Sequence, residues 1–177
     1  EIRRATVADS KTYFTHIMRH LAESGSDGDI HFHPLADSWQ TREMKTYVDR
    51  YAESWTKPID QPGWEVVWLL FQGEIAVGHV FLRSLTAVSS LHRSFLGIGM
   101  ERHVRGRGWG RKLMATAIAW AREQSSLDYV DLYVFAHNEK ARALYAKLGF
   151  VESEINRDQF RVRGQKIDDV HMVLNLR

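Results

Sequence analysis

Residues 95–124 constrain the fold more than any other segment, because a strand-length apolar run, a glycine-rich basic turn and an amphipathic helix follow one another directly. The run FLGIGM suits a strand, and RGRGWG follows it after the four residues ERHV. From Trp109 to about Gln124 the apolar side chains recur at helical spacing. A strand that passes through a turn into a helix favours a sheet covered by helices, so we expect a mixed α+β fold.

The remainder of the chain alternates helix-like and strand-like segments in the same way. We expect one helix from Asp9, as its N-cap, to about His20, a second at residues 41–55, and a third that Asn138 caps and Gly149 ends in the left-handed conformation. Strands are expected at residues 2–7, 64–71, 74–82, 95–100, 129–135, 150–155 and 170–176. The 177 residues are expected to form one domain, because neither loop-like stretch, 24–29 or 57–63, has the length of an interdomain linker.

Composition excludes several classes of protein. The 24 Lys and Arg residues nearly balance the 22 Asp and Glu residues, which argues against a surface that tracks nucleic acid. With no cysteine, the chain has no disulfide, no thiolate metal site and no cysteine nucleophile. No apolar run approaches the roughly 20 residues of a membrane span, and the N-terminus lacks the apolar core of a signal peptide. We therefore expect a cytoplasmic protein that binds neither membrane nor nucleic acid.

The turn at residues 102–112 has the composition of an anion site. It carries four arginines and no acid, and its glycines leave backbone N–H groups free to close on a phosphate at the start of a helix. A P-loop is excluded because Leu113 follows Lys112 where a hydroxyl is needed, and a dinucleotide fingerprint is excluded because Arg111 stands at its third glycine position. A pyrophosphate site and a plain Arg/Gly-rich surface loop are both consistent with the turn alone.

Two motifs together resemble the GCN5-related N-acetyltransferase (GNAT) family. Residues 105–110 match the family's Gln/Arg-x-x-Gly-x-Gly/Ala signature between a strand and a helix. Asn138, Ala141, Leu144, Tyr145, Gly149 and Phe150 match its second signature at the expected spacing. The resemblance covers residues 64–176 and implies a central sheet of about seven strands, splayed near the middle and flanked by about four helices.

The resemblance also implies a ligand and the residues that hold it. Acetyl-CoA would be the co-substrate, bound between the strands at 95–100 and 129–135, with its pantetheine arm along Ile98, Gly99 and Met100. Its pyrophosphate would lie over the turn formed by Arg105, Gly106, Arg107, Gly108, Trp109, Gly110 and Arg111. Asn138 would contact the cofactor arm. Tyr145 would border the cofactor and protonate the leaving thiolate, although its spacing alone favours a core aromatic residue.

The general base is harder to assign. In some members of the family a Glu stands eleven residues before the signature Arg or Gln, where this chain has Ser94. Glu101 is the candidate catalytic carboxylate, with a surface salt bridge to Arg102 or Arg105 as the alternative. His92 and His103 titrate in the useful range, and a water chain could replace all three.

The acceptor is expected to be an amine, carried by a small molecule or by a peptide or protein. Residues 22–40 contain four acids, Glu23, Asp27, Asp29 and Asp37, which either form an acidic lip for a cationic amine or are simply solvated. No metal site is expected, since the pair at His31 and His33 has no further ligand at suitable spacing and is better placed in a loop that lines the acceptor site.

Four tryptophans, Trp39, Trp55, Trp64 and Trp68, are assigned to the core or to a substrate pocket.

The sequence leaves open whether the protein is a monomer or a homodimer. Direct transfer of acetyl to a primary amine in a ternary complex is the leading hypothesis. The alternatives are a catalytically weak or inactive acetyl-CoA sensor of the same fold and, ranked last, a nucleic-acid binder.

Overall fold

One sheet in the order β1-β2-β3-β4-β5-β7-β6 organises the computed structural model, which describes residues 1–34 and 43–177. Neighbouring strands are antiparallel except β4 and β5, which run parallel. The expected mixed sheet is confirmed. Its strands are β1 (Ile2–Arg4), β2 (Glu65–Gln72), β3 (Ile75–Ser84), β4 (Arg93–Met100), β5 (Tyr129–Phe135), β6 (Val151–Val162) and β7 (Gln165–Asn175).

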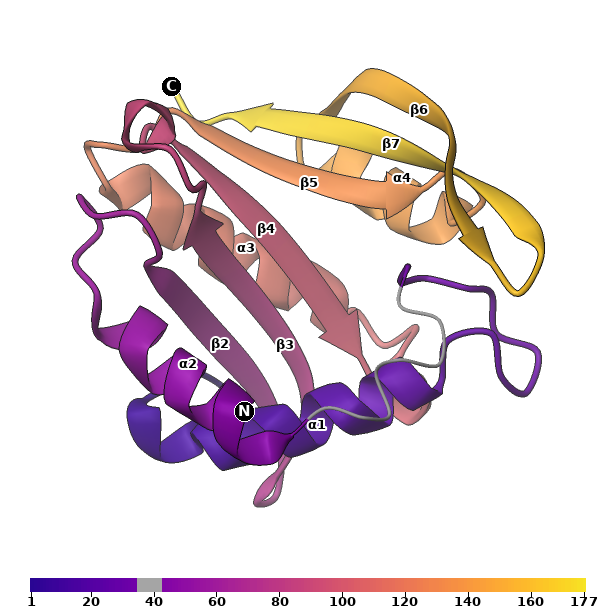
Figure 1. Ribbon diagram of the computed structural model, residues 1–177, viewed down its shortest axis with the longest axis horizontal. Coiled ribbons are helices and arrows are strands. Elements are labelled where there is room, and N and C mark those ends of the chain that lie inside the picture. Colours follow the sequence, from indigo (N-terminus) through magenta and orange to yellow (C-terminus); the bar gives the residue numbers. More distant parts are fainter. Residues whose placement is uncertain (35–42) are drawn as a thin grey trace.

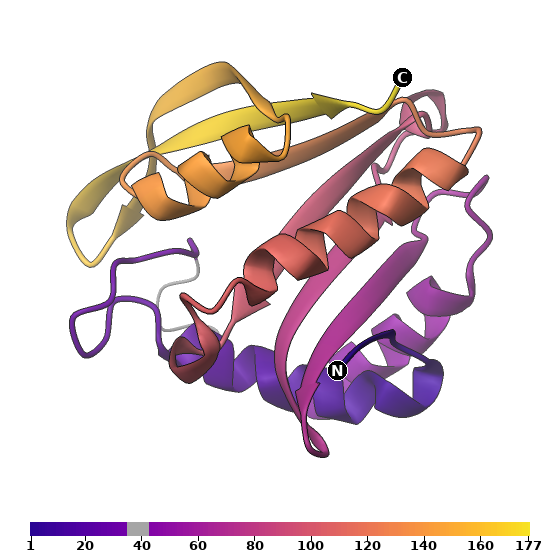
Figure 2. The ribbon, with the colours of Figure 1, turned by 180° about the vertical axis from the view of Figure 1, so that it is seen from behind.

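Helices cover both faces of the sheet. The helices α1 (Ser10–Ala22) and α2 (Met44–Thr56) lie on one face, and α3 (Trp109–Glu123) and α4 (Glu139–Lys147) lie on the other (Figures 1 and 2). Between the sheet and α3 and α4 is the larger core, which includes Trp68, Leu96, Leu113, Val130 and Met172. Beneath α1 and α2 is a smaller core that includes Tyr13, Phe14, Tyr51 and Leu69. Each helix buries its apolar stripe in this way, which fixes where its other side chains point.

The sheet opens between β4 and β5. These strands pair only where Arg93 to Phe95 face Tyr129 to Asp131, and beyond that point they diverge (Figure 1). Among the described residues, the edge of β4 that faces β5 is therefore unpaired from Leu96 to Met100, while its opposite edge pairs with β3 from Ser94 to Met100. Backbone N–H and C=O groups on an unpaired strand edge require another partner.

The C-terminal hairpin is longer than the sequence patterns predicted. Strands expected at 150–155 and 170–176 extend to Val151–Val162 and Gln165–Asn175. The turn between them consists of Arg163 and Gly164, both with positive φ (48° and 79°), as in the tight turns that close two-residue hairpins. Strand β6 is an edge strand that is exposed for most of its length, so the apolar alternation that reveals a strand is missing there.

The predicted helix ends are largely confirmed. Asn138 accepts a hydrogen bond from the backbone N–H of Ala141 at 3.3 Å, and Gly149 has a φ of 95°. Asp9 precedes α1 but makes no side-chain cap; its carboxylate instead accepts hydrogen bonds from Thr6 and Arg3. Helix α2 begins at Met44, and the expected start at Thr41 lies outside the described residues.

Candidate active site

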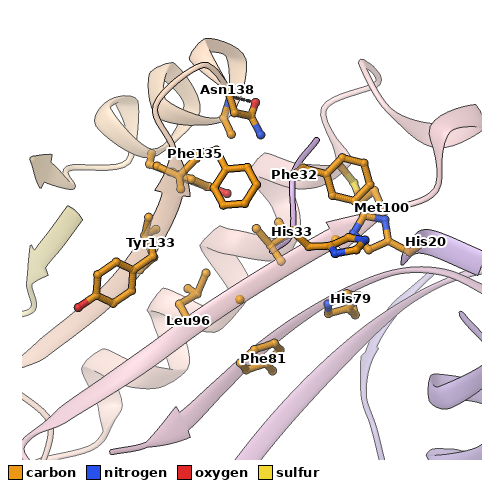
Figure 3. Close-up of a pocket in the computed structure, with 18 of the residues that line it drawn as sticks. His20, Phe32, His33, His79, Phe81, Leu96, Met100, Tyr133, Phe135 and Asn138 are labelled. Carbon is orange, nitrogen blue, oxygen red and sulfur yellow. Dashed lines mark hydrogen bonds between the residues drawn. The ribbon is translucent and has the colours of Figure 1, made fainter. Parts of the chain in front are cut away.

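A long cavity occupies the opening between β4 and β5. Its lining begins at the glycine-rich turn, continues along β4 from Leu96 to Met100 and across to α4, and ends between α1, α2 and β3. Figure 3 shows side chains from both walls converging on it, with Asn138 and Phe135 on one side and His79, Phe81 and His20 on the other. One cavity therefore joins the predicted cofactor site to the face covered by α1 and α2.

The glycine-rich turn presents an open backbone at the start of α3. Gly106 and Gly108 have φ values of 73° and 80°, and a Cβ added at either glycine would meet nothing within 4 Å. Gly108 caps α3 without a side-chain acceptor, so the N–H groups of the first helical turn are available to an outside acceptor. Arg107 and Arg111 are exposed, and neither has an acidic partner in the described part of the chain. This geometry suits an anion.

Arg102 and Arg105 have a different environment. Arg105 forms an ion pair with Glu23, donates to Asp29 at 2.7 Å and donates from Nε to the Met100 carbonyl at 2.8 Å. Arg102 donates to Asp29 at 2.9 Å and pairs with Asp27 at 3.1 Å. These contacts tie the loop after α1 to the glycine-rich turn.

The acidic lip that was considered for an amine acceptor is therefore not available as free charge at Glu23, Asp27 and Asp29; Asp37 lies outside the described residues. Burial disfavours the Asp29 carboxylate, but the hydrogen bonds from Arg105 and Arg102 outweigh it and hold the pKa of Asp29 below its ordinary value.

Tyr145 and Asn138 face the cavity from α4. Tyr145 is buried, and burial raises the pKa of its hydroxyl to about 12, so the O–H group keeps its proton at neutral pH. Asn138 uses its side-chain oxygen to cap α4, which leaves its N–H₂ group for a second partner. Ile98, Gly99 and Met100 line the cavity from the unpaired part of β4.

Glu101 does not have the surroundings that its neighbours in the sequence suggested. Its carboxylate is buried and pairs with His16 Nδ1 and Arg19 Nε, both at 2.9 Å, and it contacts neither Arg102 nor Arg105. Burial opposes its ionisation, but the hydrogen bonds from His16 and Arg19 hold the pKa of Glu101 below its ordinary value. Glu101 is not among the residues that line the cavity.

The other candidate bases also lie away from the cavity. His92 precedes β4, and His103 contacts Gln72 at 3.2 Å on an exposed surface; neither is a lining residue. Ser94 is fully buried, with an Oγ that has no hydrogen-bond partner in the described structure.

Three histidines that the sequence analysis did not single out lie in or beside the cavity. His16 and His20 stand four residues apart on α1, and His79 is on β3. His79 and His20 line the cavity, and His16 Nε2 lies 3.0 Å from His79 Nδ1. The sequence did offer a signal for these residues, because all three histidines stand within apolar segments. Only the packing of α1 on β3, however, brings them together.

The end of the cavity between α1, α2 and β3 is largely aromatic. Tyr13, Tyr51 and Phe81 line it, and Phe32 and His33 contribute from the loop after α1. Trp64 and Trp68 belong to the core, whereas Trp55 stacks on Tyr51 and donates to Glu65; Trp39 lies outside the described residues. Burial is the main reason why the pKa of Glu65 is raised.

Comparison with known proteins supports the motif analysis. The sequence model described as the Acetyltransferase (GNAT) family matches residues 29–150, more than half of the chain. This chain belongs to the GNAT acetyltransferase family. The glycine-rich turn and Asn138 to Phe150, which carried the resemblance, both fall within the match.

The individual proteins that this GNAT chain resembles match it either over a short segment or at low sequence identity. The mycothiol acetyltransferase of Salinispora tropica is 43% identical over 53 residues, which cover 30% of this chain and only 17% of that protein. An N-acetyltransferase structure from Staphylococcus aureus Mu50 has a TM-score of 0.82 at 13% identity and covers 100% of this chain and 98% of the other. YncA from Salmonella typhimurium, solved with its cofactor acetyl-CoA, has a TM-score of 0.79 at 16% identity and covers 100% and 94%. These two structures share the GNAT fold.

The described part of this GNAT chain shows neither a cluster of metal ligands nor a membrane-spanning helix. Residues 1–34 and 43–177 contain no group of three His, Cys, Asp or Glu side chains that could hold a metal ion. Within the same residues, no helix combines the length and apolar character that crossing a membrane requires.

Proposed function

We propose that this GNAT chain is an acetyl-CoA-dependent N-acetyltransferase that transfers acetyl to a primary amine by direct attack in a ternary complex. One observation carries the proposal: a single cavity runs from the open turn at Gly106 and Gly108, past Tyr145, to the aromatic pocket beneath α1 and α2. An amine that enters from the pocket end can thus reach a thioester that enters from the turn.

The residues present fit acetyl-CoA. The turn offers backbone N–H groups and the side chains of Arg107 and Arg111 to a pyrophosphate, and the space beside Gly106 and Gly108 is open, since a Cβ added there would meet nothing within 4 Å. The unpaired edge of β4 from Ile98 to Met100 can hydrogen-bond to an amide-containing arm such as pantetheine. Arg105 contributes through its backbone, because its side chain is committed to Glu23 and Asp29.

Tyr145 is the proposed general acid. When bound, acetyl-CoA supplies an activated acyl group, and the chain must then protonate the departing sulfur. The Tyr145 hydroxyl is protonated at neutral pH and lines the cavity across from β4. A backbone N–H on the unpaired edge of β4 is the proposed donor to the oxygen on which negative charge develops.

The acceptor is proposed to be a primary amine, carried by a small molecule, a peptide or a protein. The aromatic lining at Tyr13, Tyr51 and Phe81 suits an acceptor with an apolar or delocalised group beside the amine. Because Glu23, Asp27 and Asp29 are paired with arginines, their charges do not favour a strongly cationic acceptor.

Calorimetric titration with acetyl-CoA tests the cofactor site, and CoA release across a panel of amines tests the reaction. We expect saturable binding that the double variant Arg107→Ala/Gly108→Asp loses, and turnover that Tyr145→Phe reduces by about 10²-fold or more while binding persists. Binding without CoA release from any amine would favour the sensor alternative. No binding at all would reduce the turn to a basic loop, and unchanged turnover in Tyr145→Phe would remove that residue from the acid role.

A further inference from the structure

A buried chain of hydrogen bonds leads from Glu101, just after β4, through His16 on α1 to His79 at the cavity. Glu101 Oε1 lies 2.9 Å from His16 Nδ1, and His16 Nε2 lies 3.0 Å from His79 Nδ1. His16 has no exposed surface, and Glu101 and His79 are 7% and 4% exposed, so water does not compete for these contacts. Arg19 also donates to Glu101 Oε1, and its side chain is 40% exposed.

The direction of each hydrogen bond follows from the carboxylate. An ionised Glu101 can only accept, so His16 donates from Nδ1. The Nε2 atom of a neutral His16 then carries a lone pair and accepts the N–H at Nδ1 of His79. His79 is left with its own lone pair on Nε2, for which the described residues provide no hydrogen-bond partner. The chain of contacts thus ends in a basic nitrogen.

That nitrogen lies beside the strand proposed to hold the thioester. His79 on β3 is paired with Gly99 on β4, and a Cβ added to Gly99 would lie 2.5 Å from His20 Nε2 and 2.6 Å from His79 Cε1, the ring carbon between the two nitrogens. The missing side chain at Gly99 therefore lets both imidazoles approach β4 from the face covered by α1. In Figure 3, His79 stands at the cavity between Phe81 and His20.

We propose that His79 is the general base that takes the proton from the acceptor ammonium, that His16 and Glu101 are positioning residues that fix its tautomer, and that His16 receives the proton that His79 passes on. This inference rests on the proposed N-acetyltransferase function, since it assigns the base for that reaction. It also gives Glu101 a role through His16 instead of direct contact with substrate.

Protons balance along this route. A protonated primary amine that becomes an amide loses two protons as its C–N bond forms and the C–S bond breaks. One of them matches the proton that the departing sulfur takes up, and the other must leave the site. That second proton binds to His79 Nε2, the Nδ1 proton of His79 passes to His16 Nε2, and the positive charge comes to rest on His16 beside the Glu101 carboxylate.

The surroundings keep His79 in its basic form. Burial, followed by the neighbouring His16 and His20, lowers the pKa of His79 well below its ordinary value. The other titratable or charged groups around the network are Tyr13, which packs edge-on against His79, Arg19, and Arg105 and His33 near His20. His79 is thus neutral at pH 7 and passes a proton on instead of retaining it.

The chain contains a matched histidine–carboxylate pair away from the cavity. His171 Nε2 lies 2.8 Å from Asp131, and His171 Nδ1 lies 2.7 Å from Ser153 Oγ. Neither ring nitrogen of His171 is left as a free base, and His171 does not line the cavity. His171→Gln therefore controls for the general effect of breaking such a pair, and His103→Gln controls for loss of an exposed histidine.

The kinetic test measures kcat and KM from pH 4 to pH 9, a range that extends well below the ordinary histidine pKa because the pKa of His79 is lowered. In His79→Gln we expect kcat to fall by about 10² to 10⁴-fold with unchanged acetyl-CoA binding. The decrease in kcat/KM that protonation of His79 causes at low pH should be absent from this variant. In Glu101→Gln, whose amide oxygen can still accept from His16, we expect a fall of about 10-fold and an altered pH profile. His171→Gln and His103→Gln should stay within about twofold of the wild type.

Nitrogen-15 NMR of the histidine rings provides a readout that does not depend on turnover. At pH 8 we expect both His79 and His16 to carry their proton on Nδ1. A proton on Nε2 of His79 in the free protein, or a wild-type pH profile in His79→Gln, would overturn the proposal. If the wild-type chain releases no CoA with any amine, the N-acetyltransferase function is refuted, and the base role with it. This failure appears in the wild type, whereas failure of the base role alone appears only in the variants.

Discussion

Two pairs of arginines on one turn have opposite surroundings. Arg102 and Arg105 are tied to Glu23, Asp27 and Asp29 and to the backbone of the loop after α1. Arg107 and Arg111 project into solvent beside the N-terminus of α3, without acidic partners in the described structure. In the sequence the four look alike, since all stand within RHVRGRGWGR.

The difference shows that positive charge on a loop has two uses. Carboxylates neutralise Arg102 and Arg105, so this pair holds the turn in place and contributes little attraction for an anion. The unpaired charges of Arg107 and Arg111 add to the helix N-terminus and draw an anion toward it. We expect substitutions in the first pair to change stability and substitutions in the second to change ligand affinity.

The largest effect is expected for Arg105→Ala. This change removes donors to Glu23, Asp29 and the Met100 carbonyl and leaves two half-buried carboxylates without their main partner. We expect the free energy of unfolding in urea to fall by about 2 to 3 kcal/mol. Arg107→Ala is the matched control and should change it by less than about 0.5 kcal/mol. Equal stability of the two variants would contradict the structural role of Arg105.

The next effect concerns affinity and should appear in Arg107→Ala/Arg111→Ala. Two exposed cations are removed from the proposed pyrophosphate site, so the Kd for acetyl-CoA measured by calorimetry should rise about 10- to 100-fold. Thermal stability should stay near that of the wild type because neither side chain is buried. An unchanged Kd would mean that the backbone of the turn binds the anion unaided, and the distinction between the pairs would then fail.

The smallest effect is a difference in acid stability. The folded-state pKa of Asp29 is lowered by Arg105 and Arg102, so its contribution is complete above its unfolded value, near 4, and is lost as pH falls through the folded-state pKa. Between pH 6 and pH 3 the wild type should therefore lose more stability than Arg105→Ala, whereas Arg107→Ala should follow the wild type. Urea midpoints across this range measure it, and parallel curves for wild type and Arg105→Ala would refute the coupling.

The sequence predicted most of the architecture because that information is local. The alternation of apolar and polar residues predicted the strands, and apolar residues at helical spacing predicted the helices. The cap at Asn138 and the left-handed conformation of Gly149 followed from the chemistry of those residues alone. Prediction was poorest for β6, whose exposed polar residues carry no periodic signal and whose strand conformation depends on pairing with β7.

The residues of the candidate site also divide into those that local sequence predicts and those that depend on distant partners. The turn at residues 105–111 and Tyr145 could be proposed from motifs, since each lies within a short contiguous segment. The environment of Glu101 could not, because its partners His16 and Arg19 are 85 and 82 residues away in the chain. Neighbours in the sequence suggested Arg102 and Arg105, but those arginines turn toward the loop after α1.

By itself, then, the sequence determined the family, the alternation of strands and helices, and the presence of an open, basic, glycine-rich turn before α3. Such properties are set by backbone conformation and side-chain periodicity within a few residues. Tertiary structure alone decided which arginines pair with carboxylates and which histidines lie against β4. Both outcomes depend on the packing of α1 against β3 and β4, which brings His16 to Glu101 and His79 and leaves the space over Gly99 for an imidazole.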